Sequence, residues 1–251
     1  GFVAGHYTLE ECGIDLGPLA ERARALVVRS SASLVNPAMR EVICANGEVV
    51  PYDVLSIDVG SRAFTGRVKG VGEHAVVIRP LERFVQGWER VLAQARQAGM
   101  NAVSVVGGGA AGVELAFAMD HRFRQEAGAG APHVRVLTDA RTIMPEYPVA
   151  VRGRFGRLAQ RRGIGLHGGS PVTEVGAGYV RVKDAVEFPT DATFWVAGAA
   201  AAAWGGSALS VSGQAPGKRK RRLARGSWKR TGARELSEAS RPKSSRLLST
   251  R

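Results

Sequence analysis

The sequence predicts an α/β protein built around a strand, glycine turn, helix and strand. Three observations support this prediction. AVSVV at 102–106 is a run of small and β-branched residues, GGGAAG at 107–112 is a glycine turn, and HVRVLT at 133–138 is a second apolar run. Between the turn and the second run, apolar residues recur with helical spacing over 113–125. Strand, helix and strand at this spacing form a parallel βαβ unit.

The residues before this unit are first β-rich and then helical. Within residues 26–61, stretches of alternating apolar and polar residues and runs of β-branched residues are separated by turn residues, and Asn46-Gly47 is a hairpin turn. We therefore expect three or four short strands there. From Pro80 to Gly99, apolar side chains recur every three or four residues. This period predicts an amphipathic helix that begins at the proline and ends at the glycine.

The residues after the unit continue the α/β pattern as far as Gly198. Four further elements are expected: a helix at 149–162 ending at Gly163, a strand at 164–167, a hairpin at 171–182 with its turn at 176–178, and a buried strand at 193–196. Beyond Gly198 the apolar periodicity stops. Residues 199–251 are therefore expected to form an irregular, basic, disordered tail.

Most of the net charge lies in that tail. The chain carries a formal charge of +13, and thirteen Lys and Arg against two Glu fall in residues 214–251, which leaves +2 for the rest. A basic run that is not part of a folded nucleic-acid-binding domain binds nucleic acid in a salt-sensitive way and without sequence specificity. Nucleic acid is therefore not expected to be a specific partner.

Composition also restricts the other classes of protein. The two cysteines, Cys12 and Cys44, form no CxxC pair, and the five histidines show no metal-ligand spacing. No apolar run approaches the ~20 residues that span a bilayer. We therefore expect no metal, no transmembrane segment and a cytoplasmic location. The first Met is Met39, so the chain is expected to be a fragment.

The glycine turn has the spacing GxGxxG. In this pattern Gly107 permits a tight turn, Gly109 lets the backbone approach a pyrophosphate, and Gly112 lets the helix pack closely on the strand. The pyrophosphate would then lie on free N–H groups at the positive end of the helix. The candidate cofactor-binding residues of the turn are Gly107, Gly108, Gly109, Ala110, Ala111 and Gly112. The alternative is a strand-to-helix turn that binds nothing.

Two carboxylates lie close to this turn in the sequence. Glu114 is expected in the first turn of the helix, where the helix dipole stabilises any carboxylate, so a cofactor role and a purely structural one both stay open. Asp139 follows the second strand, one residue beyond the position from which an acid holds a ribose, and Thr138 occupies that position. The nearby Arg141 suits a 2′-phosphate. The pattern therefore favours NAD without excluding NADP.

The sequence resembles the pyridine nucleotide-disulfide oxidoreductase superfamily, and within it the type II NADH dehydrogenase-like branch. Three stretches carry the resemblance: VVGGGAAGVELA at 105–116, PYDVLSIDVGS at 51–61 and ATFWVAGA at 192–199. The first is similar to the NAD-binding turn with its GxGxxGxE extension, which places Glu114 near the nicotinamide half. The other two are similar to the segments at which the chain passes from the FAD domain into the NAD domain and at which it leaves the NAD domain again. They add Gly60 and Gly198 to the expected cofactor-binding residues.

The resemblance implies three parts of the chain. Residues 1–79 would be a partial FAD-binding domain, residues 80–198 an inserted Rossmann-like NAD(P)-binding domain, and residues 199–251 the tail. It also implies an enzyme, an oxidoreductase that passes electrons from NAD(P)H through FAD to a quinone or another small-molecule acceptor. No catalytic side chain is assigned. The opening, residues 3–20, is similar to the subgroup associated with selenide, water dikinase, which implies that protein as a partner.

Two features of the family are missing from this sequence. Members open with a GxGxxG for the FAD adenosine, and beyond the NAD domain they carry a Gly-Asp strand that holds the flavin. Because neither is present, the flavin-dependent activity is expected to be impaired. The alternatives are a non-catalytic NAD(H)-binding module and an inactive truncated product.

Overall fold

The computed structural model describes residues 1–66, 68–97, 99–201 and 246–248. The chain divides into two compact units. The larger unit comprises Gly1–Ile14 and Gly60–Ala202, and the smaller comprises Asp15–Val59 and Ala203–Arg251. None of the helices in the described part of the chain has the length and apolar character needed to cross a membrane.

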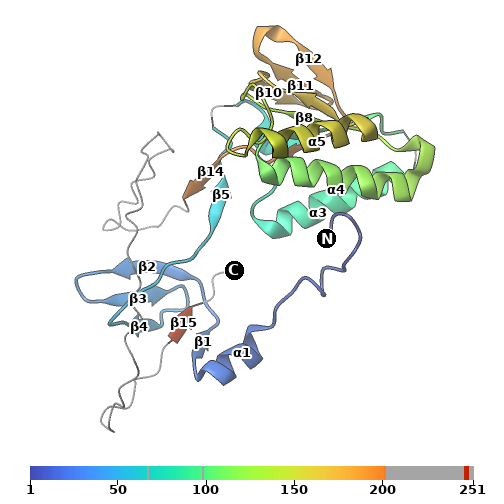
Figure 1. Ribbon diagram of the computed structural model, residues 1–251. Coiled ribbons are helices and arrows are strands. Elements are labelled where there is room, and N and C mark those ends of the chain that lie inside the picture. Colours follow the sequence, from blue (N-terminus) through green and yellow to red (C-terminus); the bar gives the residue numbers. More distant parts are fainter. Residues whose placement is uncertain (67, 98, 202–245, 249–251) are drawn as a thin grey trace, which may run out of the picture. The chain divides into compact units, whose positions relative to one another are not determined.

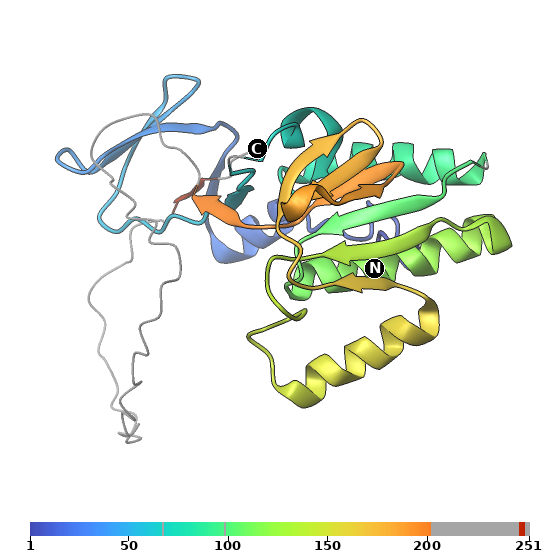
Figure 2. The same cartoon turned by 90° about the horizontal axis from the view of Figure 1, so that it is seen from above.

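The larger unit is built on a five-stranded parallel sheet (Figure 2). Its spatial order is β6-β13-β7-β8-β9, and its strands are β6 (Ala75–Val77), β13 (Ala192–Trp195), β7 (Ala102–Val106), β8 (His133–Leu137) and β9 (Gly165–His167). All five residues of β7 are buried, as expected for a central parallel strand. The predicted βαβ unit is confirmed, because β7 and β8 are parallel neighbours. The sheet begins before Pro80, the expected start of the nucleotide-binding domain, because β6 pairs with β13.

Three helices cover one face of this sheet (Figures 1 and 2). They are α3 (Leu81–Arg96), α4 (Ala110–Ala127) and α5 (Val149–Arg162). The helices predicted to begin after Pro80 and at residue 149 are confirmed. The helix predicted over 113–125 is longer than expected, because α4 begins directly after Gly109.

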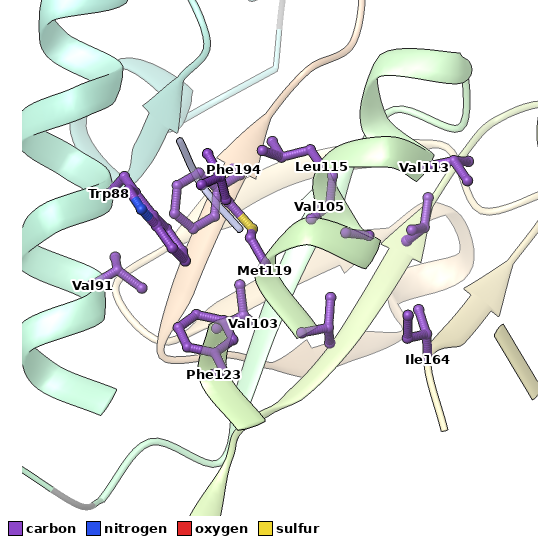
Figure 3. Packing of buried hydrophobic residues seen from close by; sticks show 14 of the residues in the cluster. Trp88, Val91, Val103, Val105, Val113, Leu115, Met119, Phe123, Ile164 and Phe194 are labelled. Atoms are coloured by element: carbon purple, nitrogen blue, oxygen red, sulfur yellow. The ribbon is translucent and has the colours of Figure 1, made fainter. Parts of the chain in front are cut away.

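The core under the helices is centred on three aromatic side chains (Figure 3). Trp88, Phe123 and Phe194 come from α3, α4 and β13, and each is at most 2% exposed. The Trp88 ring centroid lies 5.4 Å from that of Phe123 and 6.1 Å from that of Phe194. Contacts of this kind join the two helices to the sheet.

A three-stranded antiparallel sheet and a short helix cover the other face (Figure 1). The strands are β10 (Val172–Gly176), β11 (Tyr179–Val182) and β12 (Glu187–Pro189), and the helix is α2 (Val71–His74). Together β10, β11 and β12 form what we call the meander. The predicted hairpin is confirmed, with Gly178 at φ 122° in its turn. Because strand side chains alternate between faces, Val105 packs under the helices and Val106 under the meander.

Two short strands lie where the family-like stretches 51–61 and 192–199 meet. β5 (Ser61–Ala63) pairs antiparallel with β14 (Ala199–Ala201). The expectation of disorder from residue 199 onward is therefore wrong for these alanines. They show no apolar periodicity, yet their backbone groups pair with β5.

The smaller unit contains most of the β-rich segment predicted over 26–61. It comprises α1 (Leu16–Ala23), the parallel pair of β1 (Leu26–Val28) and β15 (Arg246–Leu248), and an antiparallel sheet of β2 (Ala32–Asn36), β3 (Glu41–Cys44) and β4 (Val49–Pro51). The hairpin turn at Asn46-Gly47 is confirmed, with Gly47 at φ 84°. The strand β15 is a second departure from the expected disordered tail. The basic run itself falls in 202–245, outside the described residues.

Candidate dinucleotide-binding site

The candidate site lies where β7 passes into α4. Gly107 follows β7 with φ 127°, a conformation that L side chains rarely adopt. Its N–H donates to the Leu137 carbonyl on β8 at 2.8 Å, and the Val106 carbonyl accepts from the N–H of Val196 after β13 at 2.8 Å. The turn is therefore tied to both neighbouring strands, so its backbone is held before any ligand arrives.

Three glycines of the turn are required by close packing. A Cβ at Gly107 would lie 2.9 Å from the backbone nitrogen of Ala197, and one at Gly108 would lie 2.6 Å from the Cβ of Thr138. A Cβ at Gly112 would overlap the carbonyl oxygen of Gly107. Contacts this short are not tolerated in proteins, so these positions exclude any side chain. They explain how α4 approaches β7 so closely.

Gly109 differs from the other three, because a Cβ there would meet nothing within 4 Å. It is the N-cap of α4, with extended backbone (φ −71°, ψ 178°) and no side-chain capping bond. The first N–H groups of a helix have no partner within the helix and lie at the positive end of its dipole. The N–H groups of Ala110, Ala111 and Gly112 therefore lie at an uncapped helix start, and the space beside Gly109 is open. This arrangement suits the oxygens of a diphosphate.

The segment after β8 packs beneath the turn. Thr138 is buried and touches Gly108, and the N–H of Met144 donates to the Gly108 carbonyl at 2.6 Å. The Thr138 backbone is itself held, since its N–H donates to the His167 carbonyl at 3.0 Å. Sequence reasoning missed Met144. Its role depends on a chain reversal after β8 for which the sequence carries no periodic signal.

The two predicted carboxylates are both exposed near this turn. Glu114 is the fifth residue of α4, so its expected place in the first turn is wrong. The cause is the earlier start of the helix at Ala110. Asp139 follows Thr138 directly, and its Oδ1 accepts from the N–H of Ala140 at 2.9 Å. The cofactor roles of Glu114 and Asp139 stay predictions.

Gly60 and Gly198 lie at either end of the β5–β14 ladder, away from the glycine turn in sequence. Both have left-handed φ angles, 66° and 67°. A Cβ at Gly198 would lie 3.0 Å from the Cβ of Phe64, whose carbonyl accepts from Trp195 Nε1 at 2.9 Å. Backbone conformation therefore accounts for both glycines. Their expected contact with a cofactor stays a prediction.

The parallel sheet with its glycine turn is typical of Rossmann-like flavoprotein domains. Residues 20–212 match the family described as Pyridine nucleotide-disulphide oxidoreductase, so the chain belongs to this family. Members of this family use FAD and NAD(P)H. Among the curated proteins, none matches this chain in sequence.

Several solved structures share the fold. The ferredoxin reductase of the CYP199A2 system from Rhodopseudomonas palustris is 18% identical with a TM-score of 0.66, over 79% of this chain and 47% of that one. NDH2 from Plasmodium falciparum in complex with NADH is 16% identical with a TM-score of 0.60, over 70% and 41%. Putidaredoxin reductase in its covalent complex with putidaredoxin is 20% identical with a TM-score of 0.62, over 77% and 46%. The match thus spans less than half of each of these proteins.

Proposed function

We propose that this protein is an FAD-dependent NAD(P)H oxidoreductase that passes electrons from a nicotinamide dinucleotide through flavin to a quinone or another acceptor. The observation that carries the proposal is the uncapped start of α4 at Gly109, beside open space. Membership of the pyridine nucleotide-disulphide oxidoreductase family supports an oxidoreductase activity. The acceptor, the association with selenide, water dikinase and the cytoplasmic location rest on the sequence resemblance alone.

Different residues of the turn would contact different parts of the dinucleotide. The N–H groups of Ala110, Ala111 and Gly112 donate to the diphosphate oxygens, while Gly109 keeps the approach free of a side chain. Asp139 would accept hydrogen bonds from the ribose at the end of β8. These contacts orient the dinucleotide relative to the sheet, and NAD(P)H supplies the hydride when it is bound.

The described residues contain one turn that suits the diphosphate of a dinucleotide. Among them, only Gly107–Gly112 joins a parallel strand to a helix through a glycine turn. No second unit of this kind is described that fits the diphosphate of FAD. Gly60 and Gly198 remain the residues proposed to lie beside a cofactor outside the turn.

Titration of the purified chain with NADH and NADPH by calorimetry, together with its visible absorbance, tests the proposal. We expect NADH to bind more tightly than NADPH, because the Asp139 carboxylate repels a 2′-phosphate. Flavin absorbance that bleaches on addition of NADH supports an oxidoreductase. Binding without flavin supports the NAD(H)-binding module, and failure of a folded chain to bind either dinucleotide contradicts both.

Gly109→Val is expected to weaken NADH binding by about tenfold or more, equivalent to ~1.4 kcal/mol. The added side chain would occupy the space through which the diphosphate reaches the helix. Calorimetry measures the change. Gly156→Val is the matched control, because a Cβ at Gly156 on α5 also meets nothing within 4 Å. Equal loss of affinity in the two variants would contradict the assignment of Gly109.

A further inference from the structure

A separate cleft lies on the meander side of the parallel sheet. Its volume is about 680 Å³, and it is lined by residues at the amino ends of β7, β8 and β13 and by the turn between β10 and β11. The glycine turn follows the carboxyl end of β7. The cleft is therefore distinct from the proposed dinucleotide site.

Three polar side chains form a row across the sheet at this cleft. Ser104 on β7 is the register partner of Thr193 on β13 and of Arg135 on β8. Each lies two residues before a member of the apolar cluster under the meander, so all three project from that same face. Arg135 and Thr193 line the cleft, whereas Ser104 lies between them in the row and is fully buried, not among the lining residues. A polar row therefore interrupts an otherwise apolar surface.

Two neighbouring donors in this row have no acceptor. Ser104 is 0% exposed, and its Oγ has no hydrogen-bond partner among the described residues. The same holds for the buried Nε of Arg135. Native proteins leave few buried polar groups unpaired, and most such groups meet a ligand or ordered water. The unpaired Nε of Arg135 therefore points to an acceptor that enters the cleft, with the Ser104 hydroxyl as a second, buried donor at the neighbouring position of the row.

Arg135 brings a positive charge to the cleft without a counter-charge from an ion pair in the described part of the chain. Its guanidinium forms no ion pair within the described residues, and the ring of Phe188 lies 5.5 Å from its Cζ. The pKa values of His133 and His167 are lowered, first by burial and then by the charge of Arg135. Partial burial lowers the pKa of Arg135 itself. An anion beside this guanidinium would raise all three pKa values.

The one carboxylate that lines the cleft does not supply this anion. Asp191 Oδ2 accepts from the backbone N–H groups of Asn101 and Ala102, at 2.7 and 2.9 Å. These bonds hold the carboxylate at the start of β7. The charge of Arg135 is therefore left for a ligand.

We propose that this cleft binds a small metabolite through an oxyanion, a phosphate or carboxylate group held by Arg135 and Ser104. A guanidinium offers parallel N–H donors that match such groups, and the serine hydroxyl adds a third donor beside it. Thr193 lines the path along the row toward β13. The volume suits a metabolite-sized ligand, since such sites measure roughly 300–1,000 Å³.

Titration of the full chain with inorganic phosphate and, separately, with acetate tests this site by NMR. Phosphate or acetate is expected to shift the Arg135 Nε–H and Ser104 amide resonances saturably. The affinity should fall about tenfold in Arg135→Gln and several-fold in Ser104→Ala, while Arg154→Gln, which removes an exposed arginine from α5, leaves it unchanged. Tighter binding of phosphate identifies a phosphorylated ligand, and tighter binding of acetate a carboxylate.

Two results would overturn the proposal. The first is the absence of a saturable shift with either anion, which would mean that water alone meets these donors. The second comes from the melting temperature of Arg135→Met without ligand. We expect it to be unchanged or raised, because methionine keeps an apolar stem and removes an unpaired, partly buried charge. A large decrease would show that the guanidinium already has a structural partner.

The dinucleotide site can be tested apart from this cleft. Arg135→Gln should leave the affinity for NADH unchanged, and Gly109→Val should leave the phosphate-induced shift of the Arg135 resonance unchanged. A loss of both activities in both variants would show a single shared site and would contradict the separation.

Discussion

Replacing Gly112 by alanine is expected to lower the free energy of unfolding of the larger unit by about 3 kcal/mol. The new methyl group would overlap the carbonyl oxygen of Gly107. That carbonyl cannot move away easily, because the N–H of Gly107 donates to the Leu137 carbonyl and the φ angle of Gly107 is already 127°. The helix must therefore move away from β7. Urea unfolding followed by tryptophan fluorescence measures the loss.

Gly109→Ala is the control for this substitution. A Cβ at Gly109 meets no atom within 4 Å, and its backbone is extended. Its stability should therefore stay within about 0.5 kcal/mol of the parent. If Gly109→Ala destabilises the chain as much as Gly112→Ala, the close approach of α4 to β7 is not what requires glycine in this turn.

Phe123→Ala is expected to cost about 3–5 kcal/mol of stability, because it leaves a cavity at the centre of the helix-side core. The side chain is 0% exposed and packs against Trp88. Urea unfolding again gives the change. Leu81→Ala removes an apolar side chain that is 60% exposed on α3, and it should change stability by no more than about 0.5 kcal/mol. Similar losses in the two variants would contradict the placement of the core.

The elements with a strong period were predictable from the sequence. The bounds predicted for β7 and α5 agree with the structure, because each shows one periodic pattern between clear turn residues. The start of α4 was not predictable in the same way, since Ala110 and Ala111 lie in a glycine-rich segment with no apolar stripe. That shift moved Glu114 out of the first turn.

Short strands that depend on tertiary pairing escaped prediction. β5 and β14 each span three residues, and their pairing joins segments far apart in the chain. The same limit applies to the polar row. Nothing in the sequence places Ser104 beside Arg135 and Thr193, because the register of the parallel sheet sets that contact.

The glycine spacing alone does not define the site. Residues 163–168 also read GxGxxG, yet Gly163 caps the end of α5 and Gly165 begins β9. No helix starts there to present free N–H groups. The pattern at 107–112 indicates a binding turn because a strand precedes it and a helix follows it, and both elements could be inferred from periodicity.

Titration of the isotopically labelled chain with NADH, followed through the amide resonances of Gly109, Ala111 and Gly112, tests the central claim most directly. If the backbone at the start of α4 receives the diphosphate, these resonances shift saturably in the parent chain, and those of Ala111 and Gly112 need about tenfold more NADH or greater to shift in Gly109→Val. Resonances that remain unmoved in the folded parent chain at saturating NADH would contradict it.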